Sequence, residues 1–203
     1  MSGGLTAQKR FVNSLHADFF GNQVDGDGYG GYNHVGIQAG IGTLYKLKNN
    51  NGGVGFEINY AQKGARLWPK PNQGLYQTFI FNLNYIEVPI FYVFEKWGLP
   101  FEIGPTFSYL LNTKYEFNGI SSQPNGQYRE YELGGLFGLN YRITEQLYFK
   151  FRITNSISPI LKVDNGSFNN WASGSWHRGA GLNITYFFNS PNFGSDKPEE
   201  IAD

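Results

Sequence analysis

Residues 79–94 of the chain read FIFNLNYIEVPIFYVF, an almost wholly apolar stretch that nevertheless contains a carboxylate at Glu87 and a proline at Pro89. Its first half alternates large apolar side chains with other residues, and this period of two indicates a β-strand rather than a helix. A strand with so much apolar surface must face either a protein core or lipid. The remainder of the sequence distinguishes these two environments.

The same alternation recurs in eight segments of the chain, whereas helical periodicity is hard to find. Short turns alternate with long loops rich in Gly, Asn, Pro and Ser, and both chain ends fall on the short-turn side. An even number of strands connected in this way is typical of bacterial outer-membrane barrels. The expected strands cover residues 11–20, 34–47, 54–64, 77–94, 100–117, 129–143, 146–158 and 175–189.

These patterns predict an all-β fold, an eight-stranded antiparallel up-and-down transmembrane β-barrel with short periplasmic turns and long extracellular loops. The barrel is expected over residues 11–189, and its expected location is the bacterial outer membrane. Residues 1–10 are either a signal-peptide remnant or a disordered N-terminus, and residues 190–203 are expected to form a flexible periplasmic tail. A soluble eight-stranded lipid carrier, with its apolar face turned inward, is the alternative fold.

Composition excludes several classes of function. The 203 residues suffice for one domain, and a net charge of zero gives no reason to expect nucleic-acid binding. There is no cysteine, so disulfides and thiol chemistry are excluded. No apolar run approaches the roughly 18 residues that a membrane-spanning helix needs. No catalytic residue, cofactor or metal site is expected from the sequence.

The size of the side chains indicates which face of each strand meets lipid. Bulky rings share one face in several strands, and glycine, threonine and asparagine occupy the other. The interior of an eight-stranded barrel is only just wide enough for side chains to fill, so the rings are predicted to face outward. This prediction includes the face of the fourth segment that carries Phe79, Phe81, Leu83 and Tyr85.

Charged residues fall mostly on the small, polar face. Lipid-facing Lys or Arg costs about 2–4 kcal/mol at the bilayer midplane, whereas acids and bases inside a narrow barrel can pair. We therefore expect a polar network that fills the lumen and leaves no open pore. Its predicted members are Asp18, Glu57, Glu87, Glu102, Glu132, Lys150 and Arg152.

Glu87 requires a special explanation under this assignment, because unbroken alternation from Phe79 would direct it toward lipid. A β-bulge or register break near residues 85–88 is predicted to turn it inward. Pro89 suits such an irregularity, since it cannot donate a ladder hydrogen bond. Glu87 is thus interpreted as an internal structural charge rather than a catalytic group.

Three stretches resemble the PorT-like outer-membrane β-barrel family of Bacteroidota: FEINYAQKGARL, LNYIEVPIFYVF and PFEIGPTFSYLL. Tyr60, Lys63 and Gly64 match the family's strand end, and residues 85–89 match its Tyr-aliphatic-Glu-aliphatic-Pro element. The resemblance implies an outer-membrane barrel and a connection with protein export by the type IX secretion system. It implies no catalytic residues.

The long loops are the candidate binding surface, with Asp25, Asp27, Trp68 and Trp171 as its expected residues. The segment DGDGYGG suggests a calcium site, but its spacing does not match an EF-hand, and a tight turn explains the same residues.

Two further rim features have alternative explanations. Histidines 34 and 177 near the long-loop rim could belong to a hydrolase, or could simply bond to loops. Lys63, Arg66 and Lys70 could form a basic patch for lipopolysaccharide.

We expect a non-enzymatic barrel with a structural, assembly or protein-secretion accessory role. The expected partners are the lipid bilayer, lipopolysaccharide and other envelope or secretion-system proteins. The alternatives are an adhesion or ligand-binding barrel that acts through its loops and, less favoured, a rim-located hydrolase or acyltransferase.

Overall fold

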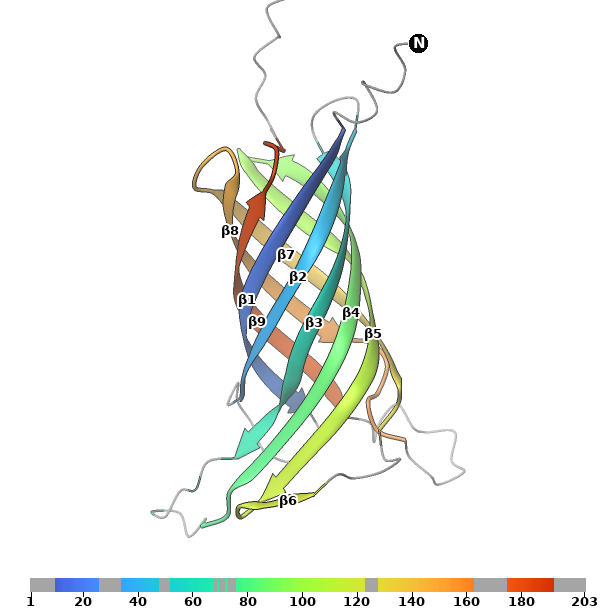
Figure 1. The fold of residues 1–203 in the computed structure, drawn as a ribbon, viewed down its shortest axis with the longest axis vertical. Coiled ribbons are helices and arrows are strands. Elements are labelled where there is room, and N and C mark those ends of the chain that lie inside the picture. The colour runs from blue at the N-terminus through green and yellow to red at the C-terminus, as the bar shows by residue number, and fades with distance from the viewer. Residues whose placement is uncertain are drawn as a thin grey trace, which may run out of the picture.

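The computed structural model describes residues 10–25, 34–47, 52–67, 69, 72, 76–122, 128–162 and 175–191. These residues form a closed barrel of eight long antiparallel strands with one additional short strand (Figure 1). In this described part, no helix is long and apolar enough to cross a membrane. The strands are β1 (Phe11–Asp25), β2 (His34–Lys46), β3 (Gly52–Leu67), β4 (Phe79–Lys96), β5 (Leu99–Phe117), β6 (Ile120–Ser122), β7 (Tyr131–Arg142), β8 (Leu147–Ser156) and β9 (Trp176–Phe187).

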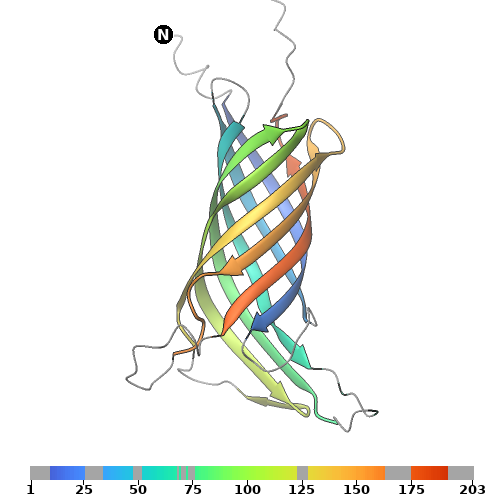
Figure 2. The same ribbon diagram turned by 180° about the vertical axis from the view of Figure 1, so that it is seen from behind.

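The barrel closes because the first and last strands pair. β1 is antiparallel to β2 on one side and to β9 on the other, and Asp18 lies opposite both Gln38 and Asn183. Each remaining barrel strand pairs with its neighbours in sequence, and β7 follows β5 in the wall. β1 begins and β9 ends at the end of the barrel that carries the short turns (Figures 1 and 2). The predicted eight-stranded, up-and-down architecture is therefore confirmed.

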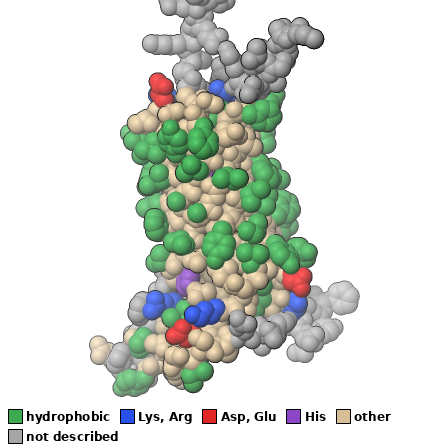
Figure 3. Space-filling model, in the orientation of Figure 1, with side chains coloured by type: hydrophobic (Ala, Val, Ile, Leu, Met, Phe, Trp, Pro, Cys, Tyr) green, Lys and Arg blue, Asp and Glu red, His purple; other side chains and the backbone are tan. Residues whose placement is uncertain are grey.

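Side chains alternate between the two faces of the wall as the sequence predicts. In β9, Leu182 and Ile184 point outward and are about half exposed, whereas Asn183 and Thr185 are fully buried inside. On the face shown in Figure 3, apolar side chains accordingly lie over the middle of the barrel, and charged side chains gather toward its two ends. An apolar outer band around a polar interior is the arrangement of a membrane barrel, in which the outer face meets lipid.

The face predicted for the start of β4 is wrong. Phe81, Leu83 and Tyr85 point into the barrel together with Glu87, and all four are almost completely buried. Alternation is continuous through this strand, so Glu87 needs no break to face inward. Side-chain size does not predict the face here, because these bulky residues pack in the lumen between the charged residues and the long-loop end. The side chain of Phe79 is not described.

A register shift does occur close to the predicted position, but it belongs to the neighbouring strand. Asn84 lies opposite Asn112, and Tyr85 lies opposite Leu110, so Leu111 is an extra residue in β5. The β3–β4 ladder keeps a single register past Glu87. The bulge therefore alters the alternation of β5 and not that of β4.

One side of the barrel extends farther than the other at the long-loop end (Figures 1 and 2). The β2–β3 ladder ends at Ala61 and the β5–β7 ladder ends at Tyr109, although β3 and β5 both continue. β6 then pairs with the end of β5. We call this extension the protruding sheet, and it comprises residues 62–67, 79–84, 110–117 and 120–122.

Candidate functional site

Arg152 is the centre of a buried charged cluster that crosses the lumen. From β8, its Nη1 and Nη2 donate hydrogen bonds of 2.7 Å each to the two carboxylate oxygens of Glu57 on β3. Its Nε donates to Glu102 on β5. Lys150, two residues earlier on β8, lies 3.5 Å from Glu102 and 3.8 Å from Glu57. The two carboxylates and the two cationic side chains of this first charged cluster therefore neutralise one another inside the lumen.

Polar neighbours complete the hydrogen bonding of this first cluster. His16 Nε2 donates to Asn59 Oδ1 at 2.8 Å and lies 3.5 Å from Glu57. Asn59 Nδ2 donates to the same Glu57 carboxylate at 3.3 Å. These contacts matter because a carboxylate removed from water needs several donors to offset the cost of burial.

A second charged cluster lies nearer the long-loop end. Lys63 on β3 lies 2.5 Å from Glu87 on β4 and 2.9 Å from Glu132 on β7. His177 on β9 donates from Nδ1 to Glu132 at 2.6 Å. Ser108 Oγ on β5 donates to Glu87 at 3.0 Å. Five strands thus contribute one polar side chain each to this cluster.

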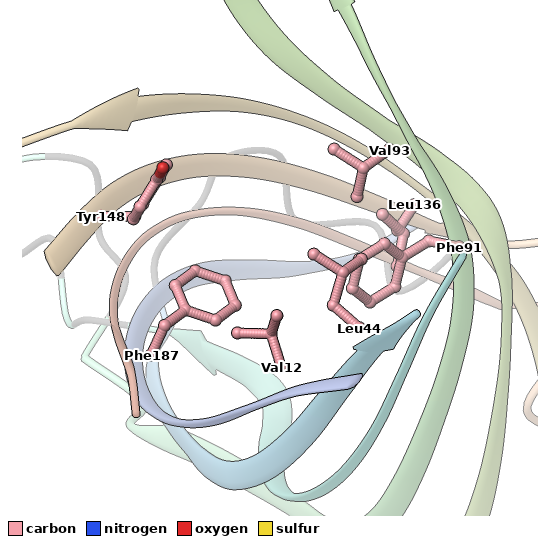
Figure 4. Close-up of a cluster of buried hydrophobic side chains, with 7 residues drawn as sticks. All are labelled: Val12, Leu44, Phe91, Val93, Leu136, Tyr148 and Phe187. Carbon is pink, nitrogen blue, oxygen red and sulfur yellow. The ribbon is translucent and has the colours of Figure 1, made fainter. Parts of the chain in front are cut away.

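Apolar side chains close the lumen on both sides of the charged clusters. Toward the short turns, rings and aliphatic chains from six strands pack together (Figure 4): Val12, Leu44, Phe91, Val93, Leu136, Tyr148 and Phe187. Toward the long loops, a second group packs together: Val24, Ala65, Phe81, Leu83, Tyr85 and Ile160. A cavity of about 20 Å³ beside Glu57, Glu102 and Lys150 has room for roughly one water molecule.

The structure places all seven residues of the predicted polar network inside the barrel, where each is buried. Arg152, Lys150, Glu57 and Glu102 come together in the first cluster, and Glu87 and Glu132 in the second. Asp18 is also buried. It lies on β1 opposite Asn183 of β9 and belongs to neither set of ion pairs.

Lys63 does not contribute to an outer basic patch. It lies inside the barrel and joins the second cluster, whereas Arg66 is on the opposite face of β3. The signal was present in the sequence: Glu57, Asn59 and Lys63 are separated by even numbers of residues and therefore share one face of a regular strand.

The two rim histidines have separate partners. His34 Nε2 donates to Asn82 Oδ1 at 2.6 Å, and His177 bonds to Glu132. Both side chains are buried. Within the described ranges, no three His, Asp or Glu residues are grouped so that they could hold a metal ion.

Several loop predictions lie outside the described residues. These are Asp27, Trp68, Lys70 and Trp171, together with almost all of the predicted N-terminal and C-terminal segments. Asp25 is the last residue of β1 and pairs with Trp176 of β9, but its side chain is not described.

Comparison with known proteins agrees with the geometry. Neisserial surface protein A, NspA, is 14% identical over 87% of this chain and 96% of its own, with a TM-score of 0.54. Ail of Yersinia pestis is 16% identical, covering 87% of this chain and 99% of its own at a TM-score of 0.47. A major outer membrane protein of Thermus thermophilus is 10% identical, covering 88% of this chain and 99% of its own at a TM-score of 0.49.

At 14% identity the NspA structure shows a shared fold only, and no curated protein sequence matches the chain. The family model described as an outer membrane protein beta-barrel domain matches residues 3–162, which is most of the sequence. The aromatic and aliphatic outer band and the closed eight-stranded wall are the arrangement of an outer-membrane barrel. The chain therefore belongs to the outer membrane protein beta-barrel domain family and is located in the outer membrane.

Proposed function

We propose that this protein is a non-enzymatic, non-conducting outer-membrane barrel that holds its protruding sheet outside the cell as a contact surface for a partner. The observation that carries the proposal is the filled lumen, in which two charged clusters are enclosed between two apolar clusters. An ion crossing this interior would have to displace both paired charges and packed rings.

The protruding sheet supports the contact role. All three residues of β6 are exposed, with Ile120 at 73%, and among the described strands β6 pairs with β5 alone. The bonded pair Asn84 and Asn112 gives the sheet a polar surface on two adjacent strands. Such a surface suits water rather than lipid, and the long loops connect to this same end.

Adhesion or ligand binding is the form of this role that the geometry favours. A narrower role as an accessory of protein secretion, including a connection with the type IX system, rests on the resemblance to PorT-like proteins alone. Contact with lipopolysaccharide would accompany either role, because the barrel is embedded in the outer membrane.

Two measurements test the proposal. In planar bilayers, the purified barrel is expected to show no stable single-channel conductance, and persistent wide pores would overturn the non-conducting part. For the contact role, residues 113–121 are replaced by a short turn, and binding of whole cells to immobilised glycans and matrix proteins is compared with that of wild-type cells. Retained binding by a correctly folded variant would reject the sheet as the contact surface.

The secretion alternative has a different readout. It predicts specific copurification of other envelope proteins from native membranes and loss of an exported protein when the chain is deleted. Normal export after deletion would reject that role while leaving the adhesion test unaffected.

A further inference from the structure

A pocket of about 340 Å³ lies at the short-turn end of the barrel, between the β4–β5 turn and the β7–β8 hairpin. The β5–β7 ladder begins only at Phe101 and Leu139, although β5 starts at Leu99 and β7 continues to Arg142. Pro100 has no N–H and cannot extend the ladder, so the two strands are unpaired over these last residues. We call the pocket the rim notch, and its lining includes Glu95, Leu99, Pro100, Tyr141, Arg142 and Tyr148.

One acid and one base line the rim notch. Glu95 is two residues from the buried Val93 on β4, and Arg142 is two residues from the buried Asn140 on β7, so both are on the inward faces of their strands. Glu95 Oε2 is buried and has no hydrogen-bond partner among the described residues. Arg142 is exposed at the end of β7. Both charged groups are therefore available to a ligand.

Tyr148 lies at the inner side of the rim notch and interacts with both charged groups. Its ring belongs to the apolar cluster that also contains Val93 and Phe187 and closes the lumen toward the short turns (Figure 4). Its hydroxyl is a hydrogen-bond partner of Arg142 and lies in the electrostatic field of Glu95. The acid and the base are thus held around one phenol at the open end of a filled barrel, where a solute reaches them without entering the lumen.

A carboxylate and a guanidinium on different strands match a ligand that carries both an ammonium and a carboxylate group. An ammonium group donates charge-assisted hydrogen bonds to a carboxylate such as Glu95, and arginine binds a carboxylate through two parallel hydrogen bonds. Leu99, Pro100 and Tyr141 add apolar surface for a side chain. The volume of the notch is near the lower limit of small-ligand pockets, about 300 Å³.

We propose that the rim notch binds a free α-amino acid with an apolar or aromatic side chain, with its ammonium group on Glu95 and its carboxylate on Arg142. The notch and the protruding sheet are at opposite ends of the barrel, so this site is independent of the proposed contact role.

The test uses L-phenylalanine and two matched analogues. N-Acetyl-L-phenylalanine lacks the ammonium group, and L-phenylalaninamide lacks the carboxylate. Binding to the full chain in phosphatidylcholine nanodiscs is measured by saturation-transfer difference NMR, with the signal of empty nanodiscs subtracted. Wild type should bind L-phenylalanine saturably and each analogue about tenfold more weakly, the loss expected for one charged hydrogen-bonded contact.

Variants assign each charged group of the ligand to its residue. Glu95→Gln should weaken L-phenylalanine binding about tenfold without changing the affinity for the N-acetyl analogue, which has no ammonium group to lose. Arg142→Gln should weaken it likewise without changing the affinity for the amide. Glu145→Gln and Arg129→Gln, which change an exposed acid and an exposed base outside the notch, should leave all three affinities unchanged.

Three results would overturn the site: no saturable binding by wild type, equal binding of L-phenylalanine and its two analogues, or equal loss of all three ligands in either charge variant. The last result would show that the side chain only supports the structure. Heat-modifiable gel migration confirms that each variant is folded. None of these results would affect the adhesion test, because that test changes only the opposite end of the barrel.

Discussion

Arg152 and Glu57 are 95 residues apart in sequence, yet two parallel hydrogen bonds of 2.7 Å join them across the lumen. Neither residue is on a strand adjacent to the other, because β3 and β8 are on opposite sides of the barrel order. The ion pair therefore joins opposite sides of the barrel through its interior. The backbone ladders join neighbouring strands around the circumference.

Removing the Arg152 guanidinium should destabilise the barrel strongly. Arg152→Ala leaves Glu57 and Glu102 buried without their main counter-charge, which we expect to cost about 3–5 kcal/mol. Urea unfolding in lipid vesicles, followed by heat-modifiable gel migration, measures the change. Lys114→Ala, an exposed change on the protruding sheet, should alter stability by less than about 0.5 kcal/mol. Equal effects of the two variants would show that Arg152 is not a structural centre.

The second cluster should behave as a coupled unit. Lys63→Met removes the ammonium group shared by Glu87 and Glu132 and should destabilise the barrel, whereas the double variant Lys63→Met/Glu87→Gln should recover part of the loss. A coupling energy of about 0.5–3 kcal/mol is expected from a double-mutant cycle of these residues. Strict additivity would contradict the direct ion pair seen at 2.5 Å.

Two glycines of β7 should differ sharply in their tolerance of alanine. A Cβ at Gly138 would come within 2.5 Å of Glu102 Cγ and Oε1, so Gly138→Ala must displace the carboxylate that binds Arg152. We expect a loss of about 1–3 kcal/mol from this overpacking. A Cβ at Gly135 would come no closer than 3.9 Å to its nearest neighbour, and Gly135→Ala should be nearly neutral. The same unfolding assay compares them directly.

A single substitution to lysine can show which part of the outer surface lies in the membrane. Ile184 on β9 and Ile120 on β6 are both exposed, at 53% and 73%. Ile184→Lys should cost about 2–4 kcal/mol if this position lies near the bilayer midplane, because a charge there meets hydrocarbon. Ile120→Lys should cost almost nothing if the protruding sheet lies in water, as the proposed function requires. Similar losses at both positions would place β6 in lipid.

The amino-acid pattern alone is enough to predict the architecture and most of the residues that face the interior. Period-two alternation, an even strand count and alternating loop lengths predicted the closed wall, and alternation also showed which side of β9 carries Asn183 and Thr185. These features are local, since the two faces of a strand follow directly from residue spacing. The same rule places Lys63 inside the barrel, because an even number of residues separates it from Glu57, whereas Arg66 falls on the opposite face.

The pairing of polar groups inside the barrel depends instead on the three-dimensional fold. Residues on one face of a strand are known from spacing, but their partners across the lumen depend on strand tilt and stagger, which are properties of the closed barrel. For this reason Arg152 with Glu57, and Lys63 with Glu132, could not be paired in advance. The extra residue at Leu111 and the inward packing of Phe81, Leu83 and Tyr85 depend likewise on the fit between neighbouring strands and on space that remains near the long-loop end.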